Sequence, residues 1–161
     1  MHELFHLTAD AFQCEVPDLS GLSFQALLLK YAWFTQEQAE RSIQCHHDLD
    51  LIKTRLYHNA YQLGQSIRKS LYITSLEEYL LISRIIYSIL SINFQGDLQG
   101  NIVIRQCYFS KFYSSEVCRI ISSLDEGLAA GLGGGNLQFY QRITEGHNCC
   151  KAHLEMEQVK V

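Results

Sequence analysis

Apolar residues in the segment 18–92 recur with the spacing that is typical of α-helices. After Pro17, the only proline of the chain, residues 21–34 (GLSFQALLLKYAWF) are apolar enough to form a buried helix. Thr35 and Gln38 then stand three residues apart, which is the spacing of a capping box at a helix N-terminus. The pattern therefore predicts that another helix begins at Thr35.

Two further stretches of this half predict helices. From Ala39 to Ile67 apolar residues recur at steps of mostly three or four, which predicts one long helix or two nearly collinear ones. The segment 74–90 (TSLEEYLLISRIIYSIL) follows, and its Ser75 and Glu78 have the spacing of a second capping box. This segment is apolar on nearly every side, so we expect its helix to be central to the core.

The second half of the chain mixes strand and helix patterns. Residues 91–107 (SINFQGDLQGNIVIRQC) combine β-branched residues with Gly-Asp and Gly-Asn turn dipeptides, which indicates a hairpin or a loop that leads to one strand. Residues 114–132 return to helical spacing, and glycines from Gly131 onward end this predicted helix. Its apolar stripe consists of Val117, Ile121, Leu124 and Leu128.

The last segments, 136–143 and 149–156, predict two antiparallel strands joined by the turn TEGHN. Successive side chains of a strand point to opposite faces, so the adjacent pair Cys149 and Cys150 is divided between two faces. The expected inward face carries Cys150, Ala152, Leu154 and Met156, and the outward face carries Cys149, Lys151, His153 and Glu155.

These elements predict an α+β fold in which N-terminal helices pack on a small antiparallel sheet, and the chain ends in strand, helix and β-hairpin. We expect a single domain over 1–161, with a helical half at 18–92 and a strand-helix-hairpin half at 93–158. A domain of this kind offers a cavity between the sheet and its helices.

Composition limits the classes of function. The chain has 161 residues, is 47% hydrophobic and carries a net charge of −4 without a run of lysine and arginine. Nucleic-acid binding needs a basic surface, so we expect a small-molecule ligand or substrate instead, and the apolar helical half is compatible with a homodimer. The sequence shows neither the long apolar run of a membrane span nor a signal peptide, and a cytoplasmic location with no membrane contact is expected.

Six cysteines raise the question of disulfides or metal. The chain lacks an export signal and contains no C-x-x-C pair, so reduced thiols are expected and a structural zinc site is not. His46 and Asp50 have helical i, i+4 spacing but lack a third ligand nearby in the sequence. We therefore expect neither a metal nor another cofactor.

Cys118, Ser122 and Asp125 are four and three residues apart, so on one helix they form a ridge beside the apolar stripe. A thiol and a carboxylate at the wall of a pocket suit a nucleophile and an anchor for a cationic or amidine-like group. The alternative is that Cys118 is a small buried apolar residue and that Asp125 is solvated. The sequence leaves both interpretations open.

Four more residues are candidates for substrate binding. Cys107 lies at the end of a predicted strand, and Cys150 faces inward by alternation, although either can be a packed thiol. Strict alternation turns Arg142 to solvent unless a bulge intervenes, and an arginine turned inward suits carboxylate binding. His147 lies in the hairpin turn, where a solvated side chain is the alternative to an acid or base.

The segment 105–150 (RQCYFSKFYSSEVCRIISSLDEGLAAGLGGGNLQFYQRITEGHNCC) resembles the C-terminal half of the L-2-amino-thiazoline-4-carboxylic acid hydrolase family. The shared pattern is a cysteine after a strand, a helix with a cysteine and then an aspartate, an apolar strand and a Gly-x-x-x-Cys hairpin. In this chain those positions are held by Cys107, Cys118, Asp125, Gly146 and Cys150.

The resemblance implies ring opening of a thiazoline or a related cyclic amidine acid. It implies that Cys118 is the nucleophile or contacts the substrate's sulfur and that Asp125 orients the amidine nitrogen. The sequence shows no dedicated histidine partner for the thiol, and activation of Cys118 by His147 is a hypothesis. The same segment is also similar to the 4-vinyl reductase domain, which implies a non-enzymatic small-molecule sensor or an accessory protein. The Glu and Cys of that domain's zinc-type pattern are replaced here by Phe139 and Arg142.

Overall fold

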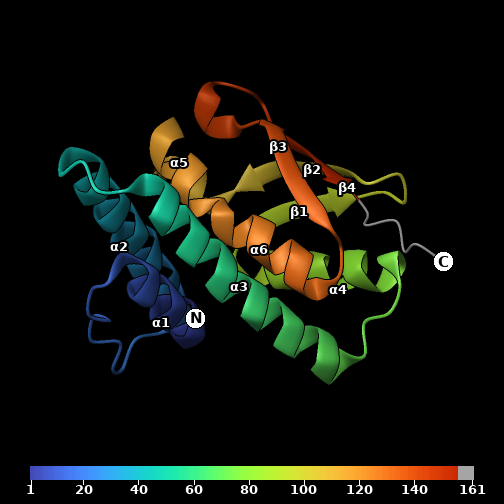
Figure 1. Cartoon of the computed structure of the whole chain (residues 1–161), viewed down its shortest axis with the longest axis horizontal. Coiled ribbons are helices and arrows are strands. Elements are labelled where there is room, and N and C mark those ends of the chain that lie inside the picture. Colours follow the sequence, from blue (N-terminus) through green and yellow to red (C-terminus); the bar gives the residue numbers. More distant parts are fainter. Residues whose placement is uncertain (156–161) are drawn as a thin grey trace.

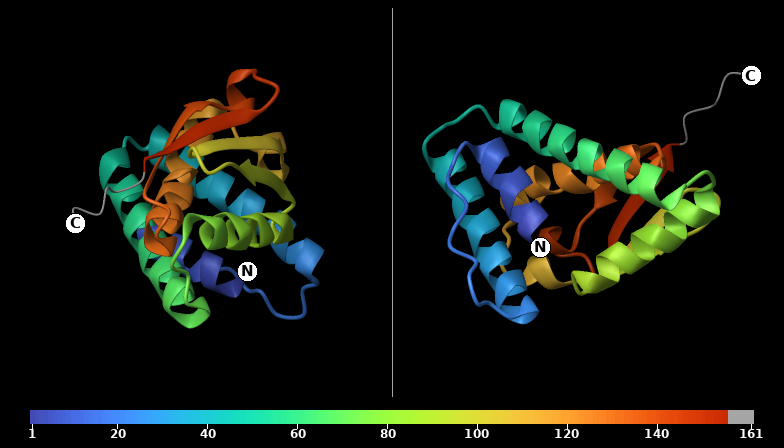
Figure 2. Two further views of the ribbon diagram at one scale, coloured as in Figure 1. Left: turned by 90° about the vertical axis from the view of Figure 1, so that its right-hand side faces the viewer. Right: turned by 90° about the horizontal axis from the view of Figure 1, so that it is seen from below.

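The computed structural model describes residues 1–155 and has the α+β architecture that the sequence predicts. Helices come first along the chain, and an antiparallel sheet with the strand order β1-β2-β4-β3 follows (Figure 1). Figure 2 shows the helices gathered on one side of this sheet. In chain order the elements are α1 (His2–Phe12), α2 (Phe24–Gln44), α3 (Leu49–Leu71), α4 (Leu76–Ile89), β1 (Ile92–Gly96), β2 (Asn101–Cys107), the 3-10 helix η1 (Tyr108–Lys111), α5 (Ser115–Ile121), α6 (Ser123–Leu132), β3 (Asn136–Gln141), the 3-10 helix η2 (Ile143–Glu145) and β4 (Cys150–Glu155).

Both predicted β regions form hairpins, and β4 lies between β2 and β3 in the sheet. The carboxylate of Asp97 closes the β1–β2 turn by accepting hydrogen bonds from the backbone N–H groups of Gln99 and Asn101 at 3.0 and 2.9 Å. Alternation along β4 is confirmed, because Cys150, Ala152 and Leu154 are buried while His153 and Glu155 are exposed. The predicted inward orientation of Met156 lies outside the described residues.

The prediction of a helix start at Thr35 is wrong, because α2 continues through this residue to Gln44. The Thr35 hydroxyl does not cap a helix; it donates to the Tyr31 carbonyl one turn earlier, at 2.8 Å. The chain leaves α2 at Cys45, and Asp48 caps the next helix by accepting from the Leu51 N–H at 3.0 Å. Figure 1 shows that α2 and α3 diverge from this turn, so they are not collinear.

Two other helical segments differ from the predicted pattern. Helix α1 was not expected, since it has no side-chain cap and is fixed by burying Phe5, Ala9 and Ala11 against its neighbours. The predicted helix at 114–132 is interrupted at Ser122, which separates α5 from α6. The Ser122 hydroxyl donates to the Arg119 carbonyl at 3.3 Å, a competing bond of the kind that bends helices.

Helix α4 begins with the predicted capping box, because Ser75 accepts from the Glu78 N–H and the Glu78 side chain accepts from the Ser75 N–H. The expectation that this helix is central to the core holds for one side only. Its inner side is buried, whereas Leu81, Ile85 and Ile89 are about half exposed. Within residues 1–155, no helix is both long and apolar enough to cross a bilayer.

Helices α3 and α6 pack backbone to backbone, and glycine makes this contact possible. A Cβ atom at Gly127 would overlap the carbonyl oxygen of Tyr57, and one at Gly131 would overlap that of Tyr61. The two helix backbones therefore touch at two points, which lie one helical turn apart on α6. This contact fixes the position of α6 and of the side chains on its other face.

Candidate functional site

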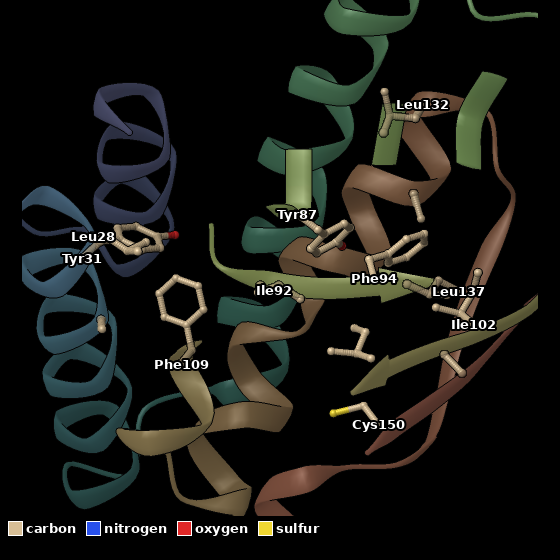
Figure 3. Close-up of a cluster of buried hydrophobic side chains, with 14 of the residues drawn as sticks. Leu28, Tyr31, Tyr87, Ile92, Phe94, Ile102, Phe109, Leu132, Leu137 and Cys150 are labelled. Atoms are coloured by element: carbon tan, nitrogen blue, oxygen red, sulfur yellow. The ribbon is translucent and has the colours of Figure 1, made fainter. Parts of the chain in front are cut away.

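A cavity of about 120 Å³ lies where the sheet meets the helices. For comparison, an engineered cavity of roughly 150 Å³ in another protein binds benzene, so this one has room for a small ring. Figure 3 shows part of its surroundings, with Ile92, Phe109 and Cys150 approaching from different elements. The lining is largely apolar and consists of Leu4, Leu7, Tyr31, Ala60, Leu63, Tyr87, Leu90, Ile92, Cys107, Phe109, Ser110, Tyr113, Cys118, Ile121, Ser122, Leu124, Asp125, Leu128, Ile143, Thr144 and Cys150.

Four residues singled out from the sequence share this cavity wall. Cys107 is the last residue of β2, Cys118 lies on α5, Asp125 on α6, and Cys150 is the first residue of β4. Pairing of Ile104 with Cys150 joins β2 to β4 at the cavity end of both strands. The interruption at Ser122 puts Cys118 and Asp125 on two helices, yet both still reach the cavity.

Asp125 is the acidic group of the cavity, and its hydrogen-bond donor is Tyr87 of α4. The Tyr87 hydroxyl donates to Asp125 Oδ1 at 2.8 Å, and its ring stacks on Phe94 with centroids 4.9 Å apart (Figure 3). Burial is the largest cause that raises the pKa of Asp125 from 3.8 to about 6; the neighbouring Glu126 adds to the shift, while Tyr87 and Arg142 oppose it. The carboxyl group is therefore poised to change its charge just below neutral pH.

Asp125 forms no direct ion pair among residues 1–155, and Arg142 acts on its charge only from a distance. The ion pairs of this part of the chain join Lys53 to Asp50 and Arg119 to Glu145. Burial, followed by the nearby Asp125, raises the pKa of Tyr87 well above its ordinary value, so the tyrosine remains a neutral donor. Above pH 6 the cavity therefore holds a negative charge that the Tyr87 hydroxyl contacts directly and Arg142 stabilises from a distance.

The three thiols of the cavity are held in the protonated form. Burial raises the pKa of Cys107 to about 12, and burial is also the largest cause of the raised pKa values of Cys118 and Cys150. Thr144 and Arg142 oppose the shift at Cys118 without cancelling it. Since the thiolate is the nucleophilic form of cysteine, these thiols are poor nucleophiles at neutral pH.

Arg142 does not point to solvent as strict alternation predicts. A register shift between Phe139 and Gln141 breaks the alternation of β3, and the Arg142 side chain is half-buried. Its guanidinium group lies 5.0 Å from the centroid of the Phe139 ring and donates to Ser122 Oγ at 3.2 Å. Its buried Nε has no hydrogen-bond partner within the described chain. Arg142 thus lies directly behind Ser122, which lines the cavity, and does not itself line it.

His147 lies apart from this arrangement. It is exposed in the turn after Gly146 and is not among the residues that line the cavity. Its proposed role as an acid or base for Cys118 gains no geometric support. His46 and Asp50 do not share a helical face either, because α3 begins at Leu49 and His46 has a left-handed backbone. Residues 1–155 contain no group of three His, Cys, Asp or Glu side chains placed to hold a metal ion.

Sequence reasoning missed the tyrosines of the cavity, and Tyr87 above all. A signal was present, because Tyr79, Ser83 and Tyr87 repeat every four residues along α4 and put polar groups on its buried side. Tyr31 and Tyr113 also line the cavity, but their hydroxyls already bond to Thr8 and Thr35, respectively. Tyr87 is the tyrosine that contacts the acid.

No protein-family model and no curated protein matches this chain.

Proposed function

We propose that the protein binds a small ring-shaped molecule carrying an amidinium or ammonium group, and that Asp125 is the counter-ion of this group. The observation that carries the proposal is a largely buried carboxyl group that forms no ion pair with a described residue and borders a largely apolar cavity. A buried charge is costly unless it is paired. A cationic ligand would supply the missing partner, and the apolar walls would hold its ring.

Size and composition of the cavity limit the ligand further. A volume of about 120 Å³ admits a five- or six-membered ring and few substituents. The protonated thiols of Cys107, Cys118 and Cys150 provide polarisable, weakly polar contacts that suit a ring sulfur or a flat π-system. This chemistry is compatible with the cyclic amidine that the sequence resemblance implies.

A second polar group, Arg142, could accommodate a carboxylate on the same ligand. Its guanidinium group has no carboxylate partner among the described residues, and its Nε is buried without a hydrogen bond. Because Ser122 separates it from the cavity, contact with a ligand requires the Arg142–Ser122 bond of 3.2 Å to open or the serine hydroxyl to relay the interaction. We assign Arg142 to the carboxylate end on this basis.

The second candidate function is hydrolysis of the bound ring, and the gathering of three thiols and one carboxyl group around the cavity favours it. In this reaction water adds to the amidine carbon, Asp125 accepts a proton from the water, the C–S bond breaks, and the departing sulfur takes up a proton. A carboxyl group with a pKa of about 6 suits a general base near neutral pH. Cys118, whose thiol is protonated, would contact the ring sulfur and not attack the carbon.

Binding is tested with a matched pair of probes, the cationic 2-amino-2-thiazoline and the neutral 2-methyl-2-thiazoline, titrated by calorimetry at pH 7.5. We expect the cation to bind at least about tenfold more tightly to the wild-type protein, and Asp125→Asn to abolish this preference. The affinity for the cation should fall as the pH drops below about 6, because Asp125 then gains a proton. Equal affinity for the two probes, or an Asp125→Asn variant that keeps the preference, would contradict the proposal.

Tyr87→Phe serves as the control variant for this titration. It keeps the acid and removes the hydrogen bond that lowers the pKa of Asp125, so the preference for the cation should remain while its pH midpoint moves upward. Hydrolysis is followed separately as release of a free thiol from 2-amino-thiazoline-4-carboxylic acid. Hydrolysis would be supported if the wild type and Cys118→Ala turn the substrate over and Asp125→Asn does not. Binding of the substrate without turnover would support the binding function and contradict hydrolysis.

A further inference from the structure

Helix α4 is apolar on two opposite sides, and only one of them faces the core. Tyr79, Leu80 and Tyr87 are buried, whereas Leu81, Ile85 and Ile89 are 55%, 48% and 53% exposed. The three exposed residues are spaced at i, i+4 and i+8, so they form one stripe along the outer side of the helix. A helix that is apolar all round is usually covered on both sides.

This stripe lies next to an open edge of the sheet. The strand order puts β1 at one edge, and α4 lies along the surface beside it (Figure 2). A groove of about 700 Å³ follows the strand, and Arg84 and Ser88 of α4 form part of its wall. The edge strand Ile92–Gly96 contains no charged residue or proline to block pairing with another strand. An apolar helix side and an unprotected strand edge thus lie side by side.

Two charges flank the stripe in an order that suits self-association. Glu77 and Arg84 are exposed, two helical turns apart on the same side of the stripe, and neither forms an ion pair within residues 1–155. Their positions lie four residues before and three residues after Leu81. If two copies of this helix cross antiparallel at Leu81, Glu77 of each copy meets Arg84 of the other. A lipid surface is a poorer match, because the chain carries a net charge of −4 and the stripe has only Arg84 beside it.

We propose that the protein forms a homodimer in which α4 packs antiparallel on α4 of a second copy, about a two-fold axis near Leu81. Leu81 meets its own counterpart at the axis, and Glu77–Arg84 pairs close the interface on both sides. Ile89 then extends toward the start of α4 in the second copy, where Tyr72 is 83% exposed. A two-fold interface repeats every contact, which is why this single charge pair counts twice.

The dimer interface must include more surface than the stripe of Leu81, Ile85 and Ile89. A stable interface needs about 800 Å² from each partner, which three half-exposed side chains do not supply. The groove along β1, whose wall includes Arg84 and Ser88 of α4, and the exposed Tyr72, four residues before the start of α4, add to the surface of the stripe. The dimer proposal does not depend on any ligand of the cavity. Its test is therefore independent of the test of the proposed function.

The experiment is sedimentation velocity of the full chain over a range of concentrations. We expect a concentration-dependent dimer, and Leu81→Glu should raise its dissociation constant by a factor on the order of 100, because two charges would be buried at the axis. Trp33→Glu is the matched control, since Trp33 is 56% exposed on α2, away from α4, and its loss should leave the dimer unchanged. Circular dichroism confirms that each variant is folded.

Charge reversal distinguishes the antiparallel arrangement from other dimers. Glu77→Arg or Arg84→Glu alone should weaken the dimer by a factor on the order of 10, since like charges then meet twice. The double variant that exchanges the two charges should recover most of the wild-type affinity. A protein that stays monomeric at high concentration, a dimer indifferent to Leu81→Glu, or a double variant that does not recover would each overturn the proposal.

Discussion

The two faces of α6 are packed in opposite ways. On the face toward α3, Gly127 and Gly131 bring the helix so close that even a Cβ atom would overlap the α3 backbone. On the face toward the sheet, Leu124, Asp125 and Leu128 border a cavity. The ten residues of this helix thus combine a backbone contact with α3 and part of the wall of a cavity.

This difference shows how a small domain can hold a buried acid in an incompletely filled space. Missing contacts around a cavity and the burial of a carboxyl group both cost stability. The backbone contact between α3 and α6 fixes the helix from behind, and with it the backbone position from which Asp125 reaches Tyr87. The rigid face therefore supports the face on which the candidate site lies.

The largest effect on stability is expected from Gly127→Ala, which adds a methyl group on the face of α6 that contacts α3. The added methyl group meets the Tyr57 carbonyl, which is backbone and cannot rotate aside, so we expect the free energy of unfolding to fall by about 4 kcal/mol. Urea denaturation followed by circular dichroism measures this loss. Gly21→Ala is the control: no atom lies within 4 Å of its Cβ position, and only the left-handed backbone at φ 68° costs about 1 kcal/mol. Equal losses for the two variants would mean that the helices are not in backbone contact.

A smaller effect on stability, which depends on pH, is expected from Asp125 on the face of α6 that borders the cavity. The folded protein holds the Asp125 proton up to about pH 6 and the unfolded chain releases it near 3.8, so the wild type should lose stability as the pH rises through this interval. The loss is at most about 3 kcal/mol, and it should level off above pH 6. Asp125→Asn cannot ionise, so its stability relative to the wild type should rise over the same interval. Denaturation at pH 4, 5, 6 and 7.5 measures the difference, and parallel pH curves would show that Asp125 is not buried.

The smallest effect is expected from Ser75→Ala, which removes the capping box at the start of α4. Loss of the cap should lower the free energy of unfolding by about 1 kcal/mol at every pH from 5 to 8. This helix carries Tyr87 to Asp125, but its cap lies far along the chain from the acid. The variant therefore separates general weakening of the cavity wall from the titration of Asp125. A pH-dependent loss in this variant would indicate that the position of Tyr87 depends on the cap.

Much of the fold could be predicted because its signals are local. The capping box of Ser75 and Glu78, the turn dipeptides of the β1–β2 hairpin and the alternation that turns Cys150 inward depend on residues a few positions apart. Helix α1 was missed for the converse reason, since it lacks a capping side chain and depends on contacts with distant elements. The wrong prediction of a helix start at Thr35 shows that capping-box spacing alone does not begin a helix, since α2 runs through this residue without interruption.

The sequence by itself determined the α+β architecture and most of the elements, because helix period, strand alternation and turn chemistry are encoded within short windows. It also identified the thiols and the acid that are candidates for the site. Only the tertiary structure decided that Cys107, Cys118, Cys150 and Asp125 share one cavity, and that Tyr87 is the partner of the acid. It also decided that Arg142, just after a register shift in β3, is half-buried beside Ser122. Those outcomes depend on strand register and on the packing of elements far apart in the chain. Electrostatics follow from the same packing, because the pKa of Asp125 is set by burial that no local pattern records.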